Sequence, residues 1–327
     1  MRFLAFTFCL LLAPAAALAT SCGTRDLLTE ITDAERQRLD ELVAAHPYPE
    51  GVIFKAEKPD SIVTVVGTIH IPDPRLAMIA DMVQADVASA DVLVLEATSA
   101  DQTKLQSLAT TKPEMFFLTE GPTLIDLLTE EEWTQITDQL SAIGVPGFFA
   151  AKFKPWYLAM TLAIPPCILT EVMAGKKGLD AQLEDIAVAN DVPIATLDNV
   201  EQLLDLLAGD PLDKQLEGLR MSLQMQEDGD AMTTTLIERY FQGKIRETWE
   251  YSRIVVEQSA MKDAGALFEE MNQALLVGRN EDWEPKIASL VDGKKAVIAV
   301  GAAHLSGEDG VVRSLERAGY QITTVYP

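Results

Sequence analysis

Hydrophobic positions follow two different periods along the chain. Short runs rich in β-branched and aliphatic residues occur at 62–66, 92–96, 193–197, 296–300 and 321–325. Runs of this length, bounded by turn residues, are typical of buried strands. Helical periodicity lies next to these runs, after a strand at 74–88 and 308–318 and before a strand at 179–190 and 281–291. Strands that alternate with helices predict an α/β fold.

The middle of the chain shows helical periodicity almost alone. From Asp101 to about Met173, and again from Val200 to Val277, apolar residues recur at helical spacing, as in the stripe Trp133, Ile136, Leu140 and Ile143. No linker rich in Pro, Gly or Ser separates these helices from the two ends. We therefore predict one α/β (α+β) domain over residues 62–327, with a central sheet built from N- and C-terminal βαβ-like units and a large helical insertion.

The N-terminus has the pattern of a secretory signal. Arg2 supplies a positive charge, Phe3 to Leu12 an apolar run, and Ala17-Leu18-Ala19 a cleavage site, so residues 1–19 are predicted to be removed. Residues 20–61 then form an extension in which a capping box at Thr32 opens a helix. The apolar run is too short to span a bilayer, and no later segment is a candidate span. The mature protein is expected to be periplasmic or secreted, with a lipid anchor at Cys22 as the alternative.

The charge of the chain excludes some classes of partner, and its cysteines predict a disulfide. The formal net charge is −24, which argues against nucleic acid and anionic lipid surfaces as partners. The simplest explanation of the negative charge is a solvated acidic surface that needs no specific partner. Removal of Cys9 with the signal leaves Cys22 and Cys167, an even pair in an oxidising compartment, which predicts a disulfide. Two unpaired thiols or an acylated Cys22 are the alternatives.

A repeated pattern carries the candidate chemistry. Gly67-Thr68-Ile69-His70 and Gly301-Ala302-Ala303-His304 each follow a predicted strand. Gly67 and Gly301 let the chain turn sharply as it leaves the strand. The chain has three histidines, and the third, His46, lies in a turn without this setting. Because ligands of open α/β sheets bind at the carboxyl ends of strands, we expect the two imidazoles to share one rim.

Glu96 extends this set, because it ends the strand 92–96. Two imidazoles and a carboxylate, His70, His304 and Glu96, can bind a divalent metal with positions left for water and substrate. The same residues can also perform acid–base catalysis without a metal. Both alternatives remain open at this point.

These motifs resemble the TraB/PrgY/GumN family, which includes the animal Tiki proteins. The resemblance runs from about Ile62 to the C-terminus and rests on the two glycine-led histidines, Glu96, Gly178-Leu179-Asp180, Arg279-Asn280, Trp283, Gly307 and Gly310. It implies an α/β core related to the erythromycin-esterase and ChaN-like proteins. The Tiki branch implies a metal-dependent protease that acts outside the cell.

The resulting hypothesis is a secreted or periplasmic hydrolase, most simply a peptidase that uses Mn, Co or Zn. Arg279 and Asn280 are predicted to hold a substrate carboxylate or stabilise an oxyanion. Lys152 and Trp156, in an aromatic stretch, are weaker candidates for a peptide or small-molecule cleft. The alternatives are a metal-independent His/Glu esterase-type hydrolase and a non-catalytic binding or sequestering protein linked to peptide signalling or polysaccharide export.

Overall fold

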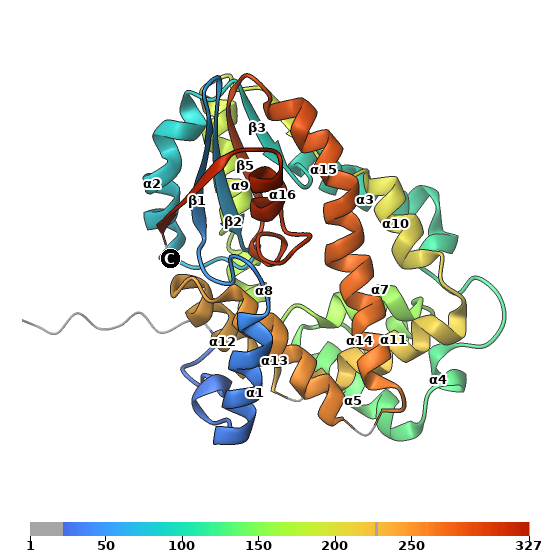
Figure 1. Ribbon diagram of the computed structural model, residues 1–327. Coiled ribbons are helices and arrows are strands. Elements are labelled where there is room, and N and C mark those ends of the chain that lie inside the picture. Colours follow the sequence, from blue (N-terminus) through green and yellow to red (C-terminus); the bar gives the residue numbers. More distant parts are fainter. Residues whose placement is uncertain (1–21, 226–227, 260, 327) are drawn as a thin grey trace, which may run out of the picture.

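The computed structural model describes residues 22–225, 228–259 and 261–326. The predicted signal peptide therefore lies outside the described residues. Within them, six strands form one sheet in the order β4-β3-β5-β2-β1-β6 (Figure 1). The strands are β1 (Ile53–Lys58), β2 (Ser61–Thr68), β3 (Val92–Leu95), β4 (Ile194–Thr196), β5 (Lys295–Gly301) and β6 (Gln321–Tyr326). The α/β fold class is thus confirmed.

The strand register brings four carboxyl ends to one edge of the sheet. Strands β4, β3, β5 and β2 are parallel neighbours. Thr68 of β2 pairs with Gly301 of β5, while Leu95 of β3 pairs with Ala299 of β5 and with Thr196 of β4. The two ends of the chain therefore meet in the middle of the sheet, because β5 lies between β2 and β3.

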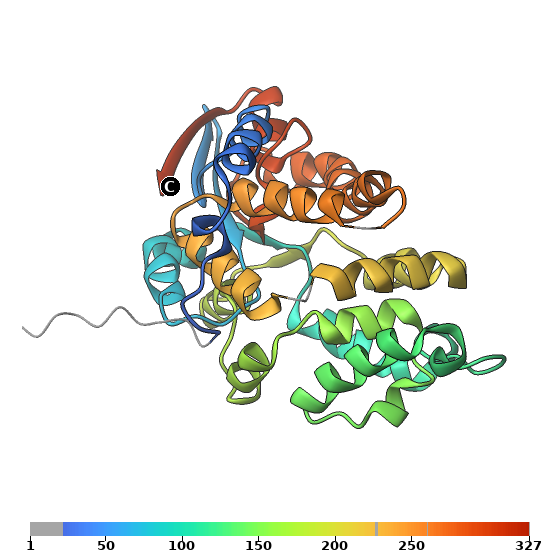
Figure 2. The ribbon, with the colours of Figure 1, turned by 90° about the horizontal axis from the view of Figure 1, so that it is seen from below.

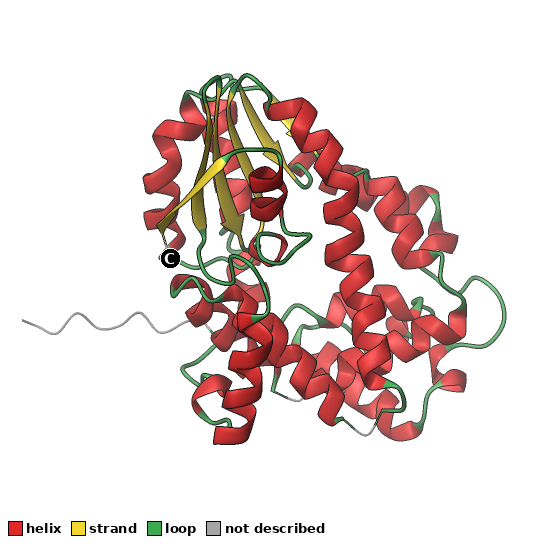
Figure 3. Cartoon of the chain, viewed as in Figure 1, coloured by secondary structure: helices red, strands yellow, loops and turns green. Residues whose placement is uncertain are grey.

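Helices cover both faces of the sheet, because its central strands are apolar on both sides. Along β5, Val297 and Ala299 belong to a core formed with α2 (Leu76–Ala88) and α9 (Leu179–Ala189). Ile298 and Val300 belong to the opposite core, formed with α15 (Gly278–Val291) and α16 (Val311–Arg317). Figure 3 shows these helices on the two sides of the strands.

The remaining helices form a separate layer beside the carboxyl ends of the strands. Figure 2 shows most of them apart from the sheet. Their bounds are α1 (Asp33–Ala44), α3 (Ser99–Thr111), α4 (Leu124–Leu127), α5 (Glu130–Ala142), α6 (Gly147–Ala150), α7 (Pro155–Leu162), α8 (Pro166–Met173), α10 (Val200–Ala208), α11 (Leu212–Met225), α12 (Gly229–Phe241), α13 (Ile245–Gln258) and α14 (Ala264–Asn272). The predicted capping box at Thr32 begins α1.

Strand β1 lies in the region that the sequence analysis placed in the N-terminal extension. It runs antiparallel to both β2 and β6 and so belongs to the sheet. Its local pattern is a weak strand signal, since Lys55 and Glu57 interrupt the apolar residues. In the structure these polar side chains alternate with the buried Phe54 and Ala56, as expected of a strand.

The predicted disulfide between Cys22 and Cys167 is confirmed. The two Cα atoms lie 5.2 Å apart, and the bond ties the N-terminal segment to α8. No single helix among the described residues is long and apolar enough to cross a membrane. The bent pair α7 and α8 meets the length and composition criteria only when the two helices are taken together.

Candidate active site

Four polar side chains follow the four parallel strands at the same edge of the sheet. Glu96 comes directly after β3, and His304 ends a short 3-10 turn after β5. His70 and Asp198 each lie two residues beyond the last residue of β2 and β4. The structure thus places the predicted Glu96, His70 and His304 at one rim, and adds Asp198 from the edge strand.

Arg279, near the start of α15, connects three of these strand ends. Its Nη1 lies 3.0 Å from Nε2 of His304, and its Nη2 donates to Oδ2 of Asp198 at 2.6 Å. The same Nη2 also donates to Glu96. A planar guanidinium offers donors in a fixed fork, so one arginine can hold both carboxylates while it faces the imidazole. Arg279 therefore lies at the rim with Glu96 and His304, whereas its role towards a substrate stays a prediction.

Asn280 holds the other side of the His304 ring. Its Oδ1 lies 2.7 Å from Nδ1 of His304, and its Nδ2 donates to the backbone oxygen of His304 at 3.3 Å. Arginine can only donate, so Nε2 of His304 must accept. The proton of the neutral ring then lies on Nδ1, where it donates to Asn280. This pair of contacts fixes both the tautomer and the ring orientation.

Burial keeps His304 neutral. Its side chain is only 4% exposed, and its ring packs on the indole of Trp283 with 4.4 Å between centroids. Burial lowers the pKa of His304 to about 4, and the nearby charge of Arg279 acts in the same direction against the opposing effect of Glu96. A neutral imidazole at physiological pH keeps a lone pair at Nε2, which Arg279 occupies here and which a proton or a metal ion could take only after that contact opens.

Glu96 remains ionised although it is buried. Burial opposes its negative charge, but the neighbouring imidazole of His304, the guanidinium of Arg279 and a hydrogen bond from the Gly301 backbone together lower the pKa of Glu96. The Gly301 N–H donates to Oε1 of Glu96 at 2.5 Å. A Cβ on Gly301 would lie 3.0 Å from that same oxygen. The second motif glycine therefore allows the carboxylate to approach the end of β5.

His70 has a different environment from His304. Its side chain is 69% exposed, and its Nδ1 lies 3.1 Å from Oδ1 of Asp180. This carboxylate raises the pKa of His70, with burial opposing it. Asp180 lies in the first turn of α9. The start of this helix can approach His70 closely because Gly178 has no Cβ, which would otherwise lie 2.7 Å from the His70 Cα. The charges of Glu96 and Arg279 also affect the pKa of His70, which places the two histidines in one electrostatic environment.

The donor set fits a divalent metal in kind. Each histidine has Nδ1 beside an oxygen acceptor, Asp180 or Asn280, which is the arrangement that commonly orients metal-binding imidazoles. In the described residues, however, the ligand atoms of His70, Glu96 and His304 do not lie within 4.8 Å of one another as a set. Arg279 instead contacts both Glu96 and Nε2 of His304. A metal shared by these two residues would therefore require Arg279 to withdraw.

Two acidic residues of the site were not singled out from the sequence. Asp198 follows strand β4, which the sequence predicts. A carboxylate that follows a predicted parallel strand, as Glu96 follows β3, was the signal that could have identified Asp198. Asp198 Oδ1 also accepts from Nε1 of Trp283 at 2.8 Å, which explains a polar role for that otherwise buried indole. Asp180 entered the sequence analysis only through the family resemblance. Its position in the first turn of the helix after Gly178 was the signal that could have identified it.

Lys152 and Trp156 lie in the helical layer. The indole of Trp156 packs on Phe116 with 5.5 Å between ring centroids and donates to the Met115 backbone oxygen at 3.0 Å. Lys152 accepts a backbone hydrogen bond from Leu118. These contacts account for the local packing, and a substrate role for either residue stays a prediction.

Comparison with known protein families gives a match over most of the chain. The family model of the TraB/PrgY/gumN family matches residues 52–324, which include strands β1 to β5, most of β6 and each of the site residues described above. A comparison with curated protein sequences gave no match. The chain therefore belongs to the TraB/PrgY/gumN family.

Proposed function

We propose that this protein is an extracytoplasmic hydrolase, a peptidase in the simplest form, that activates water at the rim formed by His70, Glu96 and His304. The observation that supports it best is the neutral His304, buried beside the guanidinium of Arg279 and oriented by Asn280. A neutral base next to a fixed positive charge is the combination that acyl hydrolysis requires, because negative charge develops on the substrate oxygen as water attacks.

In the version without a metal, the residues take separate roles. Once the Arg279 guanidinium shifts from Nε2 towards the substrate, Nε2 of His304 accepts a proton from water, while the proton on Nδ1 stays there and donates to Asn280. Arg279 then faces the developing oxyanion, since its charge persists at any pH of interest. Asp198 and Glu96 hold the guanidinium in place. His70, which Asp180 supports in its protonated form, is suited to protonate the leaving group.

A divalent metal is part of the favoured version. His70, His304 and Glu96 would hold it, and a bound metal of this kind lowers the pKa of water and polarises a carbonyl. The metal-independent version is the second candidate. It is favoured by one specific observation, namely that Arg279 contacts both Glu96 and Nε2 of His304 directly.

One experiment separates these possibilities. The purified mature protein is analysed for bound metal and then incubated with a peptide library, with and without a chelator. Bound metal with chelator-sensitive cleavage supports the metallopeptidase, and metal-free cleavage supports the acid–base hydrolase. The His70→Ala and His304→Ala variants should both lose cleavage. Lys262→Ala is the control, because its side chain is 94% exposed and its ion pair is with Asp263, which is not a residue of the site. Absence of turnover with every substrate class would contradict both versions and favour a binding protein.

A further inference from the structure

A π turn immediately precedes Arg279. Residues Gln273–Val277 form it, between the end of α14 and the start of α15, with the Gly278 N–H donating to the oxygen of Gln273. The Leu275 oxygen, inside this turn, accepts from Nη1 of Arg279 at 3.1 Å. The same Nη1 faces His304, so the turn directly contacts the group that reaches the site. Such π turns are rare and often occur at functional sites.

Above the turn, α15 is fixed to the sheet. Trp283 and Ile287 are buried in the core beneath the strands. The indole of Trp283 additionally donates to Asp198. The position of α15 along the sheet is therefore set by packing and by a hydrogen bond at the site.

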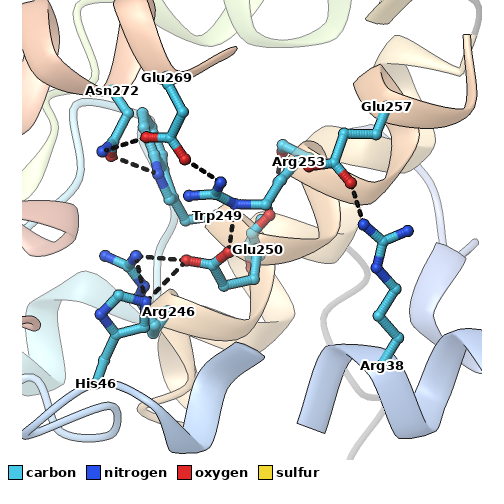
Figure 4. A network of polar contacts seen from close by, with 11 residues as sticks. Arg38, His46, Arg246, Trp249, Glu250, Arg253, Glu257, Glu269 and Asn272 are labelled. Atoms are coloured by element: carbon cyan, nitrogen blue, oxygen red, sulfur yellow. Dashed lines mark hydrogen bonds and ion pairs between the residues drawn. The ribbon is translucent and has the colours of Figure 1, made fainter. Parts of the chain in front are cut away.

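Below the turn, α14 is fixed to α13, as Figure 4 shows. Nε1 of Trp249 donates to Oδ1 of Asn272 at 3.1 Å, one residue before the π turn begins. Arg253 donates to Glu269, and its guanidinium lies 4.9 Å from the ring centroid of Phe268. These contacts determine the register of α14 against α13.

Glu250 is the anchor of this second attachment. Its side chain is fully buried and accepts from Arg253 at 2.8 Å and from Arg246, while Nε2 of His46 lies 3.3 Å away (Figure 4). Burial opposes its charge, but His46 and the two arginines outweigh this and lower the pKa of Glu250 to about 2. Arg253 is thus held between Glu250 and Glu269.

The same network reaches the loop that follows His304. The Gly307 N–H donates to the oxygen of Pro47 at 3.0 Å. A Cβ on Gly307 would lie 3.7 Å from Nδ1 of His46 and 3.8 Å from Nη1 of Arg246. The buried cluster of His46 and residues of α13 therefore lies next to two segments. One is α14, which leads through the π turn to Arg279, and the other is the loop that follows His304.

We propose that Trp249, Glu250 and Asn272 are positioning residues, which fix the register of the π turn and so direct the guanidinium of Arg279 onto His304. The sheet fixes the position of α15, and α13 fixes the position of α14. The π turn between them therefore has to connect two helices whose relative position is already set. Release of α14 removes that constraint, and the Leu275 oxygen and Nη1 of Arg279 then move together. The catalytic use of Arg279 rests on the proposed function, whereas its placement does not.

The test observes the His304 ring without any substrate. Protein labelled with ¹⁵N-histidine is examined by NMR at neutral pH as wild type, Trp249→Phe, Asn272→Leu and Arg279→Lys. Trp249→Phe removes the indole N–H and keeps an aromatic ring. We expect the His304 Nε2 resonance to move in both α13–α14 variants towards the position it takes in Arg279→Lys, while the His70 resonances stay in place. Trp133→Phe is the matched control, because Trp133 packs in the helical layer on α5.

The outcomes are distinct. A His304 Nε2 resonance that keeps its wild-type position in both Trp249→Phe and Asn272→Leu overturns the proposal, provided that thermal unfolding shows both variants to be folded. Should Trp249→Phe fail to fold, Asn272→Leu decides alone, since the half-buried Asn272 lies at a helix end. Because the readout needs no turnover, failure of the hydrolase proposal leaves this result unaffected.

Discussion

Arg279 and His304 face each other across the carboxyl ends of the strands, with 3.0 Å between Nη1 and Nε2. A permanent cation beside an imidazole disfavours protonation of that imidazole. The contact therefore selects a neutral His304 whose Nε2 is an acceptor. Both residues were expected at the site, but their direct contact follows from the meeting of α15 with the turn after β5.

Replacement of Arg279 by alanine should destabilise the fold. It would leave the carboxylates of Glu96 and Asp198, which are 14% and 10% exposed, without their shared cation. Loss of one partner from a buried ion pair costs on the order of 3 kcal/mol, which urea unfolding at neutral pH would measure. The double variant Arg279→Ala/Asp198→Asn should recover part of this loss. A single variant as stable as wild type would contradict the assigned pairing.

Stability should fall as the pH is lowered, because of His304. Its pKa is about 4 in the folded protein and 6.5 as the ordinary value, so between these pH values the unfolded chain binds a proton that the folded one does not. The contribution of His304 is complete above about pH 6.5 and is lost as the pH falls to 4, by up to about 3 kcal/mol. Unfolding free energies measured across this window should show a smaller slope in His304→Gln. An unchanged slope would refute the assignment.

His70 should titrate in the opposite direction. The carboxylate of Asp180 raises the pKa of His70, so Asp180→Asn is expected to lower it. The stability gained from this pair is present below the ordinary histidine pKa and is lost as the pH rises through the raised value. NMR titration of His70 in the wild type and in Asp180→Asn measures the shift. A His70 pKa that does not fall would show that another group controls it.

The sequence could predict the rim but not its internal connections. Matched glycine-led histidines after apolar strands, and a strand that ends on Glu96, are local signals, and parallel strands bring such ends together. Whether Arg279 reaches them depends on how α14, the π turn and α15 are joined. That geometry is set by tertiary contacts far along the chain, such as Trp249 with Asn272, and no local pattern encodes it.

Strand β1 shows the same limit in the fold. Its alternation over Ile53–Lys58 is short, and only the pairing with β2 and β6 makes it part of the sheet. Strands with strong apolar runs were predictable because they are buried on both faces. The helical layer was predictable in kind, from its periodicity, whereas its position beside the strand ends depends on packing between helices.

Loss of the disulfide should lower the stability of the protein without altering the site. Cys22 and Cys167 are separated by 145 residues, and closing a loop of that length stabilises by about 2–5 kcal/mol in the chain-entropy account. The Cys22→Ser/Cys167→Ser variant is expected to unfold at lower denaturant concentration and to keep the wild-type histidine NMR signals. Two titratable thiols in denatured, unreduced wild-type protein would contradict the bond.

The two motif glycines should differ in their tolerance of a methyl group. At Gly67, a Cβ would lie 2.9 Å from the Cβ of Ala302 and 3.0 Å from its Cα, so the turn carrying His304 has to move. At Gly301, the new Cβ would meet Oε1 of Glu96 at 3.0 Å, and that side chain can adjust. We expect Gly67→Ala to cost about 1–3 kcal/mol, with a smaller loss for Gly301→Ala, because overpacking is costly where the backbone must shift.

Gly218 provides the matched control for these two substitutions. It lies inside α11, and nothing approaches within 4 Å of the position its Cβ would take. Gly218→Ala is therefore expected to stabilise the protein by about 0.5–1 kcal/mol, since alanine is preferred over glycine within helices. Unfolding of the three variants by urea gives the ranking. If Gly67→Ala were tolerated as well as Gly218→Ala, the close approach of β2 to the His304 turn would be wrong, and with it the geometric reason for the glycine in the first motif.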